Sequence, residues 1–237
     1  MNFLKPKHLV SLILLCCLVF LVSYINGNLW LSNTSRALVV PLFAVLYFVN
    51  SKEISPYFMI FLICYSVSDL ISIYGFSRRL EWEYYIGNSL YIIAYLSFSF
   101  EILLSINKRH ILKYFKAHVI VLGIVNIYAN YVLIKFQSDY VSSLDYIMEL
   151  FYNLSTTILV SVSLLNYFYR DDKKALILFL GSLAIAVSEV IQIVYYYLMD
   201  GSEAHILNVS YSLFLILGFY FYYVQSKLEY EEVLVIA

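Results

Sequence analysis

Residues 64–70 read Cys64-Tyr65-Ser66-Val67-Ser68-Asp69-Leu70 and place one acid, Asp69, inside an apolar segment. This segment opens a longer stretch, residues 58–95, in which a short polar link over 75–83 leads into a second apolar segment with Gly87-Asn88-Ser89-Leu90-Tyr91. An ionisable group inside a membrane helix costs about 2.5–3.5 kcal/mol on insertion scales, so it predicts a functional role and a polar partner.

The composition indicates a membrane protein. Of the 237 residues, 62% are hydrophobic and 13% are charged, whereas soluble domains carry about 25% charged residues. The net charge is −1 and no basic stripe occurs, so we expect no nucleic-acid partner.

Eight apolar runs approach the roughly 20 residues that a helix needs to cross a bilayer. They predict an all-α, polytopic integral membrane protein, an eight-helix transmembrane bundle that forms a single domain over residues 1–237. The second run contains Pro41 and is short, so we expect it to be tilted or only partly spanning. The predicted helices cover residues 9–25, 37–49, 56–74, 84–106, 117–135, 145–169, 175–198 and 206–224.

The distribution of Lys and Arg predicts the orientation, because cytoplasmic segments carry an excess of positive charge. With the N-terminus inside, eleven basic residues fall on the cytoplasmic side and four fall on the outside, namely Arg36, Arg78, Arg79 and Lys135. Eight crossings return the C-terminus to the same side, so we expect an N-in, C-in topology.

No cofactor or metal site is expected. The three cysteines lie in apolar runs without a CxxC spacing, and the four histidines are scattered without a paired i,i+4 arrangement. Buried cysteines commonly act as small hydrophobic residues.

Polar residues recur at helical spacing on six of the predicted helices, all in the outer half of the membrane. Asp69 lies roughly 8 Å and Glu189 about 14 Å from the predicted outer end of its helix. Because lipid cannot satisfy such groups, they predict an internal polar cavity. The candidate site residues are Asp69 and Glu189 as catalytic acids, with Asn88, Tyr91, Glu149, Asn153, Gln192 and Tyr211 as substrate-binding residues.

Other polar residues on these helices have a simpler interpretation. Asn, Ser and Thr side chains in membrane helices more often join helices through hydrogen bonds than form sites. We expect this joining role for Asn126, Asn130, Thr156 and Ser182, and a structural role for Glu101 near the cytoplasmic end of its helix.

Three motifs resemble the YhhN-like lysoplasmalogenase family. They are Arg36-Ala37-Leu38-Val39-Val40-Pro41-Leu42, then Ser68-Asp69-Leu70, then Gly87-Asn88-Ser89-Leu90-Tyr91. Later, Gly181-Ser182-Leu183 with Ser188-Glu189, and residues 207–211, are similar to that family's last two helices.

The chain departs from the family pattern at three positions. Ser68 stands for a glycine, Asn88 for a histidine and Glu189 for a second aspartate. Without the histidine, the chain lacks a possible proton carrier at this position. Moving a carboxylate by about 1 Å can lower a reaction rate about 10²-fold. An altered or lost activity is therefore one interpretation of these departures.

The resemblance implies hydrolysis of the vinyl-ether bond of lysoplasmalogens, which yields a fatty aldehyde. One carboxylic acid would protonate the alkene carbon, and the other would act as base and stabilise the oxocarbenium ion, as paired acids do in glycoside hydrolysis. The sequence leaves open which of Asp69 and Glu189 takes which role.

The alternative is a non-catalytic membrane sensor or assembly module with a polar intramembrane ligand pocket. An ion or proton carrier is disfavoured because the sequence lacks the internal repeats and broken helices typical of that class. The expected partner is a membrane lipid or lysolipid, and the oligomeric state stays open. The expected host is a bacterial inner membrane or a eukaryotic endomembrane.

Overall fold

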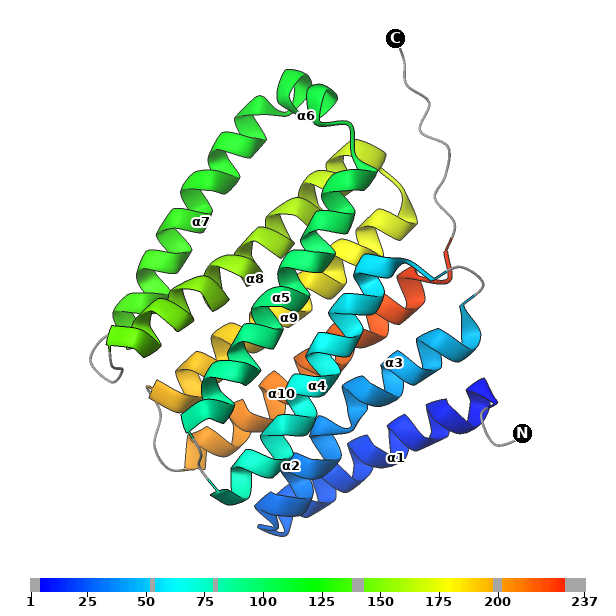
Figure 1. The fold of residues 1–237 in the computed structure, drawn as a ribbon, viewed down its shortest axis with the longest axis vertical. Helices are drawn as coiled ribbons and strands as arrows, with labels where there is room; N and C mark the ends of the chain where they lie inside the picture. The colour runs from blue at the N-terminus through cyan, green and yellow to red at the C-terminus, as the bar shows by residue number, and fades with distance from the viewer. Residues whose placement is uncertain (1–4, 52–53, 79–80, 138–142, 198–201, 229–237) are drawn as a thin grey trace. The chain divides into compact units, whose positions relative to one another are not determined.

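Helices account for 92% of the residues that the computed structural model describes, which are 5–51, 54–78, 81–137, 143–197 and 202–228. No strand occurs in these ranges. The helices follow one another along the chain as shown in Figure 1, namely α1 (Pro6–Ile25), α2 (Leu29–Ala37), α3 (Val39–Asn50), α4 (Pro56–Arg78), α5 (Glu81–Ser105), α6 (Lys108–Tyr114), α7 (Lys116–Gln137), α8 (Ser143–Arg170), α9 (Lys173–Tyr197) and α10 (Ser202–Gln225).

Eight segments of the described chain are long and apolar enough to cross a membrane. Seven lie each within one long helix, while α2 and α3 together supply the span Leu29–Asn50. The predicted all-helical fold with eight candidate spans is confirmed, and it fits a multi-pass integral membrane protein.

The N-terminal helix has clear start and stop signals. Pro6 occupies the first helical position of α1, where its missing N–H removes no hydrogen bond. At the other end Gly27 adopts φ +72°, a left-handed conformation that favours glycine, and its N–H donates to the carbonyl of Tyr24 at 3.0 Å.

The short helix predicted over 37–49 is present as α3, but the loop with Arg36 predicted before it was wrong. The structure has helix on both sides of Leu38, and Arg36 lies in the last turn of α2. Pro41 explains the interruption, because it cannot donate to the carbonyl of Ala37 and its ring crowds that oxygen. The result is a complete candidate span that contains a positive charge.

The predicted polar link over 75–83 was also wrong. Helix α4 continues to Arg78 and α5 already begins at Glu81. The stretch contains no proline, and a single glycine costs a helix only about 1 kcal/mol relative to alanine. The acid Glu83 therefore lies in the first turn of a helix.

A short helix that the sequence did not predict, α6, follows α5. The Asn107 side chain accepts hydrogen bonds from the N–H groups of Arg109 and His110, as an N-cap does. With seven residues, α6 is too short to span a membrane.

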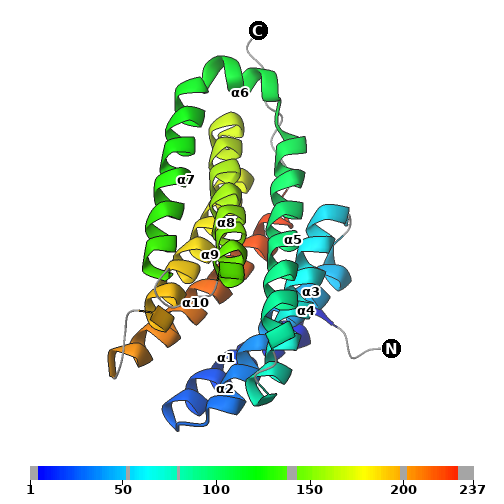
Figure 2. The same cartoon turned by 60° about the vertical axis from the view of Figure 1, so that its left-hand side comes forward.

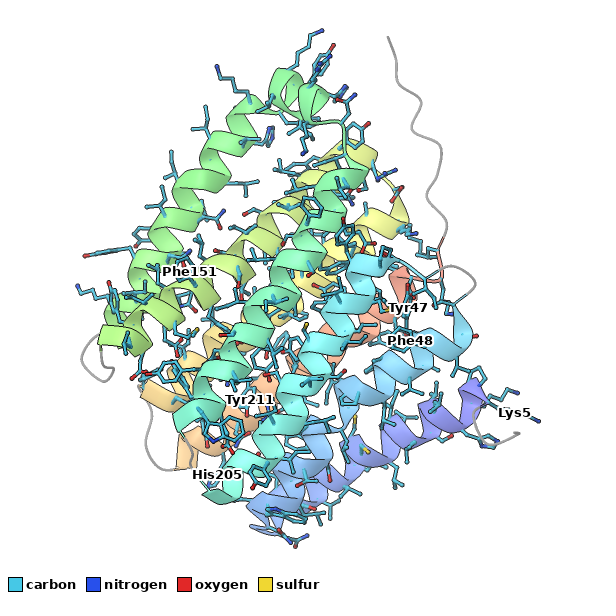
Figure 3. All side chains as sticks on the ribbon, viewed as in Figure 1. Lys5, Tyr47, Phe48, Phe151, His205 and Tyr211 are labelled. Carbon is cyan, nitrogen blue, oxygen red and sulfur yellow. The ribbon has the colours of Figure 1, made fainter. Side chains whose placement is uncertain are left out.

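Chain contacts divide the molecule into two compact units, Met1–Ser97 and Phe98–Ala237. In the first unit, α1 packs against α2 and α3, and α4 packs against α2 and α3 (Figure 1). Tyr47, labelled in Figure 3, stabilises the α3–α4 connection. Its ring centroid lies 4.9 Å from that of Phe58 in an edge-on contact, and its hydroxyl accepts a hydrogen bond from the Ser55 N–H at 3.1 Å.

The second unit contains the end of α5 and helices α6 to α10. Helices α9 and α10 run side by side, as both Figure 1 and Figure 2 show, and α8 packs against α7 and α9. The last turn of α5 joins this unit through Ser105, whose carbonyl accepts from the Arg170 guanidinium at 2.7 Å. The single domain predicted over residues 1–237 stays a prediction.

Both units expose many large apolar side chains. Ile25 on α1 is 83% exposed and Ile127 on α7 is 75% exposed, among many other large aliphatic and aromatic side chains on these helices. In water such faces would be strongly unfavourable, whereas lipid tails solvate them. This exposure agrees with helices that face the bilayer.

Candidate functional site

In the first unit, helices α4 and α5 approach each other closely at one polar point. Ser68 Oγ on α4 donates to the carbonyl oxygen of Gly87 on α5 at 2.9 Å. A Cβ at position 87 would lie 3.3 Å from that Oγ, so the absence of a side chain at Gly87 allows the approach. Because the two helices run in opposite directions, the residues before Ser68 lie beside those after Gly87, as the ring contact of Tyr65 with Tyr91 shows.

Asp69, one residue beyond that contact, is buried with 6% of its surface exposed. The Tyr91 hydroxyl on α5 donates to Asp69 Oδ1 at 2.7 Å, an ordinary length for an O–H···O hydrogen bond. Tyr65, buried on α4, meets the Tyr91 ring edge-on at 4.6 Å and holds it in place. Tyr91 is therefore a polar partner of the kind that a buried acid such as Asp69 requires in a membrane.

A positive charge lies in the same neighbourhood. Arg36 on α2 is half-buried, and its charge acts electrostatically on the Tyr91 hydroxyl. Since α2 packs against α4, this cation and the Asp69 carboxylate belong to one polar region of the first unit. Arg36 was predicted to lie in an outside loop, so this arrangement was not expected from the sequence.

A pocket of about 250 Å³ opens between α4 and α5 next to this pair. Both Asn88 and Tyr91 line it, so two predicted substrate-binding residues share one pocket. Asp69 contacts the pocket through the Tyr91 hydroxyl and does not line it. The lining residues are Ser68, Ile71, Ser72, Glu83, Tyr84, Gly87, Asn88 and Tyr91.

Glu83 is the second site residue that the sequence analysis missed. It lines the pocket, with only 9% of its surface exposed. Two signals were available in the sequence. Glu83, Gly87 and Tyr91 follow the four-residue spacing of one helix face, and the run of residues 29–50 is long enough to be one span that includes Arg36.

The other predicted acid, Glu189, belongs to the second unit. It is buried on α9 with 7% of its surface exposed, next to Ser188, whose hydroxyl donates to the carbonyl of Tyr211 at 2.8 Å. Tyr211, labelled on α10 in Figure 3, is itself 2% exposed and its ring centroid lies 6.1 Å from that of Tyr195. The predicted pairing of Asp69 with Glu189 stays a prediction.

The remaining predicted site residues also lie in the second unit. On α8, Glu149 and Asp145 both act electrostatically on Tyr197 of α9, and Asn153 is buried. Gln192 on α9 is half-buried. The two acids of α8 therefore lie near Tyr197 of α9.

Several polar residues join helices directly. Asn126 and Asn130 on α7 donate to Ser161 Oγ and Thr157 Oγ1 on α8, at 2.8 and 3.0 Å. These bonds agree with the predicted joining role of the two asparagines. Thr156 differs, because its hydroxyl donates to the carbonyl of Tyr152 on its own helix.

Metal ligands do not cluster in the described part of the chain, where no group of three His, Cys, Asp or Glu side chains is close enough to hold a metal ion. The three cysteines are free thiols. In the first unit the hydrogen-bonded Asp69 and Tyr91 lie beside a pocket that Glu83 also lines.

Comparisons with known proteins add no relative. No protein-family model, no curated protein and no solved structure matches the chain.

Proposed function

We propose that the chain is a membrane-embedded lipid hydrolase, similar in activity to lysoplasmalogenases, which cleaves the vinyl-ether bond of a lysolipid. The observation that carries the proposal is the 2.7 Å hydrogen bond from the Tyr91 hydroxyl to Asp69 at a pocket of about 250 Å³. It sets an acid–base pair beside a space that a substrate can enter, in a helix pair whose outer surface faces lipid.

The reaction requires a proton donor and a base. The sequence leaves the two roles open, and in this proposal Glu189 is the donor. It adds a proton to the alkene carbon, and the ether oxygen stabilises the resulting oxocarbenium ion. Water then attacks that ion. The water proton passes to the Tyr91 oxygen while the Tyr91 proton passes to Asp69. The hemiacetal collapses to a fatty aldehyde and an alcohol, and the protons return to Tyr91 and the donor.

The orientation that we propose is N-in, C-in. With Arg36 in α2 rather than in a loop, the outside count falls from four basic residues to three, while eleven remain inside. Cysteines introduced singly at Lys108 and Lys7 should both react with a membrane-impermeant reagent from the cytoplasmic side only. Labelling of Lys108→Cys from the opposite side would overturn this topology. The proposed host is a bacterial inner membrane or a eukaryotic endomembrane.

The activity test uses the purified full-length protein in lipid nanodiscs with a lysoplasmalogen as substrate and fatty aldehyde as the measured product. We expect turnover by the wild type, and a loss of at least about 100-fold in Asp69→Asn and in Glu189→Gln, because general acid–base groups contribute about 10²–10⁴-fold. Glu101→Gln, a substitution of the same kind outside the proposed site, should retain activity.

Two results would contradict the proposal. Aldehyde release no faster than in empty nanodiscs would remove the hydrolase function altogether. Full activity in Asp69→Asn would remove Asp69 from the mechanism even if hydrolysis occurs.

A second function is favoured by one observation. Asn88 lines the pocket at the position where the resembled family carries a histidine, and an amide binds ligands but does not transfer protons. A non-catalytic sensor with an intramembrane ligand pocket would bind a lysolipid at this site and leave it intact. Binding without aldehyde release distinguishes this function from hydrolysis.

A further inference from the structure

One acid that lines the pocket in the first unit has a buried oxygen with no hydrogen-bond partner among the described residues. Glu83 lies in the first turn of α5 and lines the pocket, and more than nine-tenths of its surface is buried. Its Oε1 atom is buried and has no hydrogen-bond partner in the described part of the chain. The other carboxylate of this region, Asp69, differs because it already accepts from Tyr91.

A buried carboxylate without a partner is unfavourable, because it has lost water without gaining a hydrogen bond or an opposite charge. Such a group persists where a ligand supplies the missing partner. The ligand of Glu83 should therefore carry a positive charge or hydrogen-bond donors.

The other walls of the pocket indicate which cation fits. Tyr84 follows Glu83 directly and Tyr91 lies two helical turns further along α5, and both line the pocket. A tyrosine ring attracts cations over its face, and aromatic rings combined with a carboxylate are typical of sites that recognise organic ammonium groups. The rings favour an alkylated cation over a fully hydrated one.

The size of the space agrees with a polyatomic ligand. At about 250 Å³ the pocket is several times the roughly 30 Å³ that one water molecule occupies in the liquid. A single inorganic cation would leave most of it empty, and the described residues supply no cluster of three charged or imidazole ligands for one. An anionic group would meet the Glu83 carboxylate with the same charge.

We propose that the α4–α5 pocket binds an organic ammonium group, with Glu83 as its anionic partner and the rings of Tyr84 and Tyr91 as its walls. The ammonium belongs either to the head group of a lipid or to a free amine. The inference rests on the proposed function only in taking this pocket as the binding site. Binding is measured apart from hydrolysis, so either proposal can fail alone.

The test measures equilibrium binding to the full-length protein in nanodiscs of phosphatidylglycerol, which has no ammonium group. The main probe is a lysophosphocholine with a saturated ether chain, which has no vinyl-ether bond to cleave. A matched probe replaces the trimethylammonium group with the neutral 3,3-dimethylbutyl group of the same shape. We expect the wild type to bind the charged probe at least 10-fold more tightly than the neutral one.

The variants test whether Glu83 causes this preference. Glu83→Gln should reduce the preference to less than 3-fold, whereas Glu83→Asp, which keeps the charge, should retain part of it. Glu101→Gln is the matched control, because it makes the same change 18 residues, or roughly 27 Å, further along α5. It should leave the preference unchanged.

Free choline separates the two sources of the ammonium group. Competition by choline at concentrations near those of the lipid probe would assign a free amine, and competition only at far higher concentrations would assign a lipid head group. Equal binding of the charged and neutral probes by the wild type would overturn the proposal. An unchanged preference in Glu83→Gln would overturn it as well, and the wild-type comparison stands even if that variant fails to fold.

Discussion

Two helix pairs in this protein contain the same residue types, but one pair is closely packed and the other has a pocket beside it. In α9–α10, the backbones meet at Gly181 and Gly218, and the Tyr222 hydroxyl donates to Ser182 Oγ at 3.0 Å. In α4–α5, the glycine is Gly87 and the tyrosine is Tyr91, which donates to a carboxylate instead of a serine. The pocket described above lies at the α4–α5 pair.

Packing accounts for the difference. A Cβ at Gly218 would lie 2.6 Å from Ile185 Cγ1, and a Cβ at Gly181 would lie 2.7 Å from the Tyr222 ring, so no space remains between α9 and α10 at these positions. At Gly87 the nearest atom is the Ser68 hydroxyl at 3.3 Å. Small and polar residues alone therefore do not mark a site. The acid and the space beside it do.

The largest effect is expected from filling the tight pair. Gly218→Leu must displace Ile185 and also approach the carbonyl of Gly181, which a Cβ at position 218 would meet at 3.1 Å. We expect a loss of about 3 kcal/mol in the free energy of unfolding, measured in mixed micelles, because overpacked cores lose about 1–3 kcal/mol or more.

The control for this prediction is a glycine with open space around it. At Gly123 on α7 no atom lies within 4 Å of the place that a Cβ would occupy, so Gly123→Leu should not destabilise the protein and, by helix propensity, should stabilise it by up to about 1 kcal/mol. Equal effects at positions 123 and 218 would show that α9 and α10 are not packed as tightly as the distances indicate.

The next effect compares the two tyrosines. Tyr91→Phe removes a hydrogen bond to a buried carboxylate, and bonds to charged groups contribute about 1.5–3 kcal/mol. Tyr222→Phe removes a bond to a hydroxyl that also donates to the carbonyl of Leu178, and interhelical bonds of this kind average about 0.6 kcal/mol. Unfolding of both variants in the same micelles should rank Tyr91→Phe as the more destabilising.

A larger loss of stability in Tyr222→Phe than in Tyr91→Phe would contradict the contrast between the two helix pairs. It would mean that the Asp69–Tyr91 bond is worth no more than an ordinary contact between helices. The case for Asp69 as the centre of a site would then lose its main support.

Much of the fold was predictable because the bilayer imposes strict rules. Long apolar runs gave all eight candidate spans. The helical faces also identified Tyr91 and Asn88 as neighbours of the Asp69 region, since residues three or four apart on one helix share a face.

The errors occurred where polar residues continue a helix. Residues 33–36 read Asn-Thr-Ser-Arg and were assigned to a loop, yet they form part of α2, because backbone hydrogen bonds are more favourable in a helix than unpaired in lipid. The same error placed Glu83 in a link. Hydropathy reports where a chain is apolar, and it does not report where a polar segment must still be helical.

The pocket itself was beyond the reach of sequence patterns. Its existence depends on a narrow space between α4 and α5, set by how Ser68 meets Gly87. Similar serine and glycine residues leave no such space where α9 meets α10. Side-chain packing decides between the two outcomes, and no spacing rule encodes it.

The smallest effect is expected at Gly87. An alanine there would place its Cβ 3.3 Å from Ser68 Oγ, so the serine must move by a few tenths of an ångström. Against this, alanine in a helix interior is favoured over glycine by about 0.8–1.0 kcal/mol. The two effects oppose each other, so Gly87→Ala should change the free energy of unfolding by less than about 0.5 kcal/mol.

In a Ser68→Ala background, where the clash is absent, the same substitution should be stabilising by up to about 1 kcal/mol. A double-mutant cycle in micelles measures this coupling. A loss of more than about 2 kcal/mol in Gly87→Ala alone would exceed what a small shift of one serine can cost, and would show that α4 and α5 are packed as tightly as α9 and α10. The contrast between a closed helix pair and an open one would then disappear.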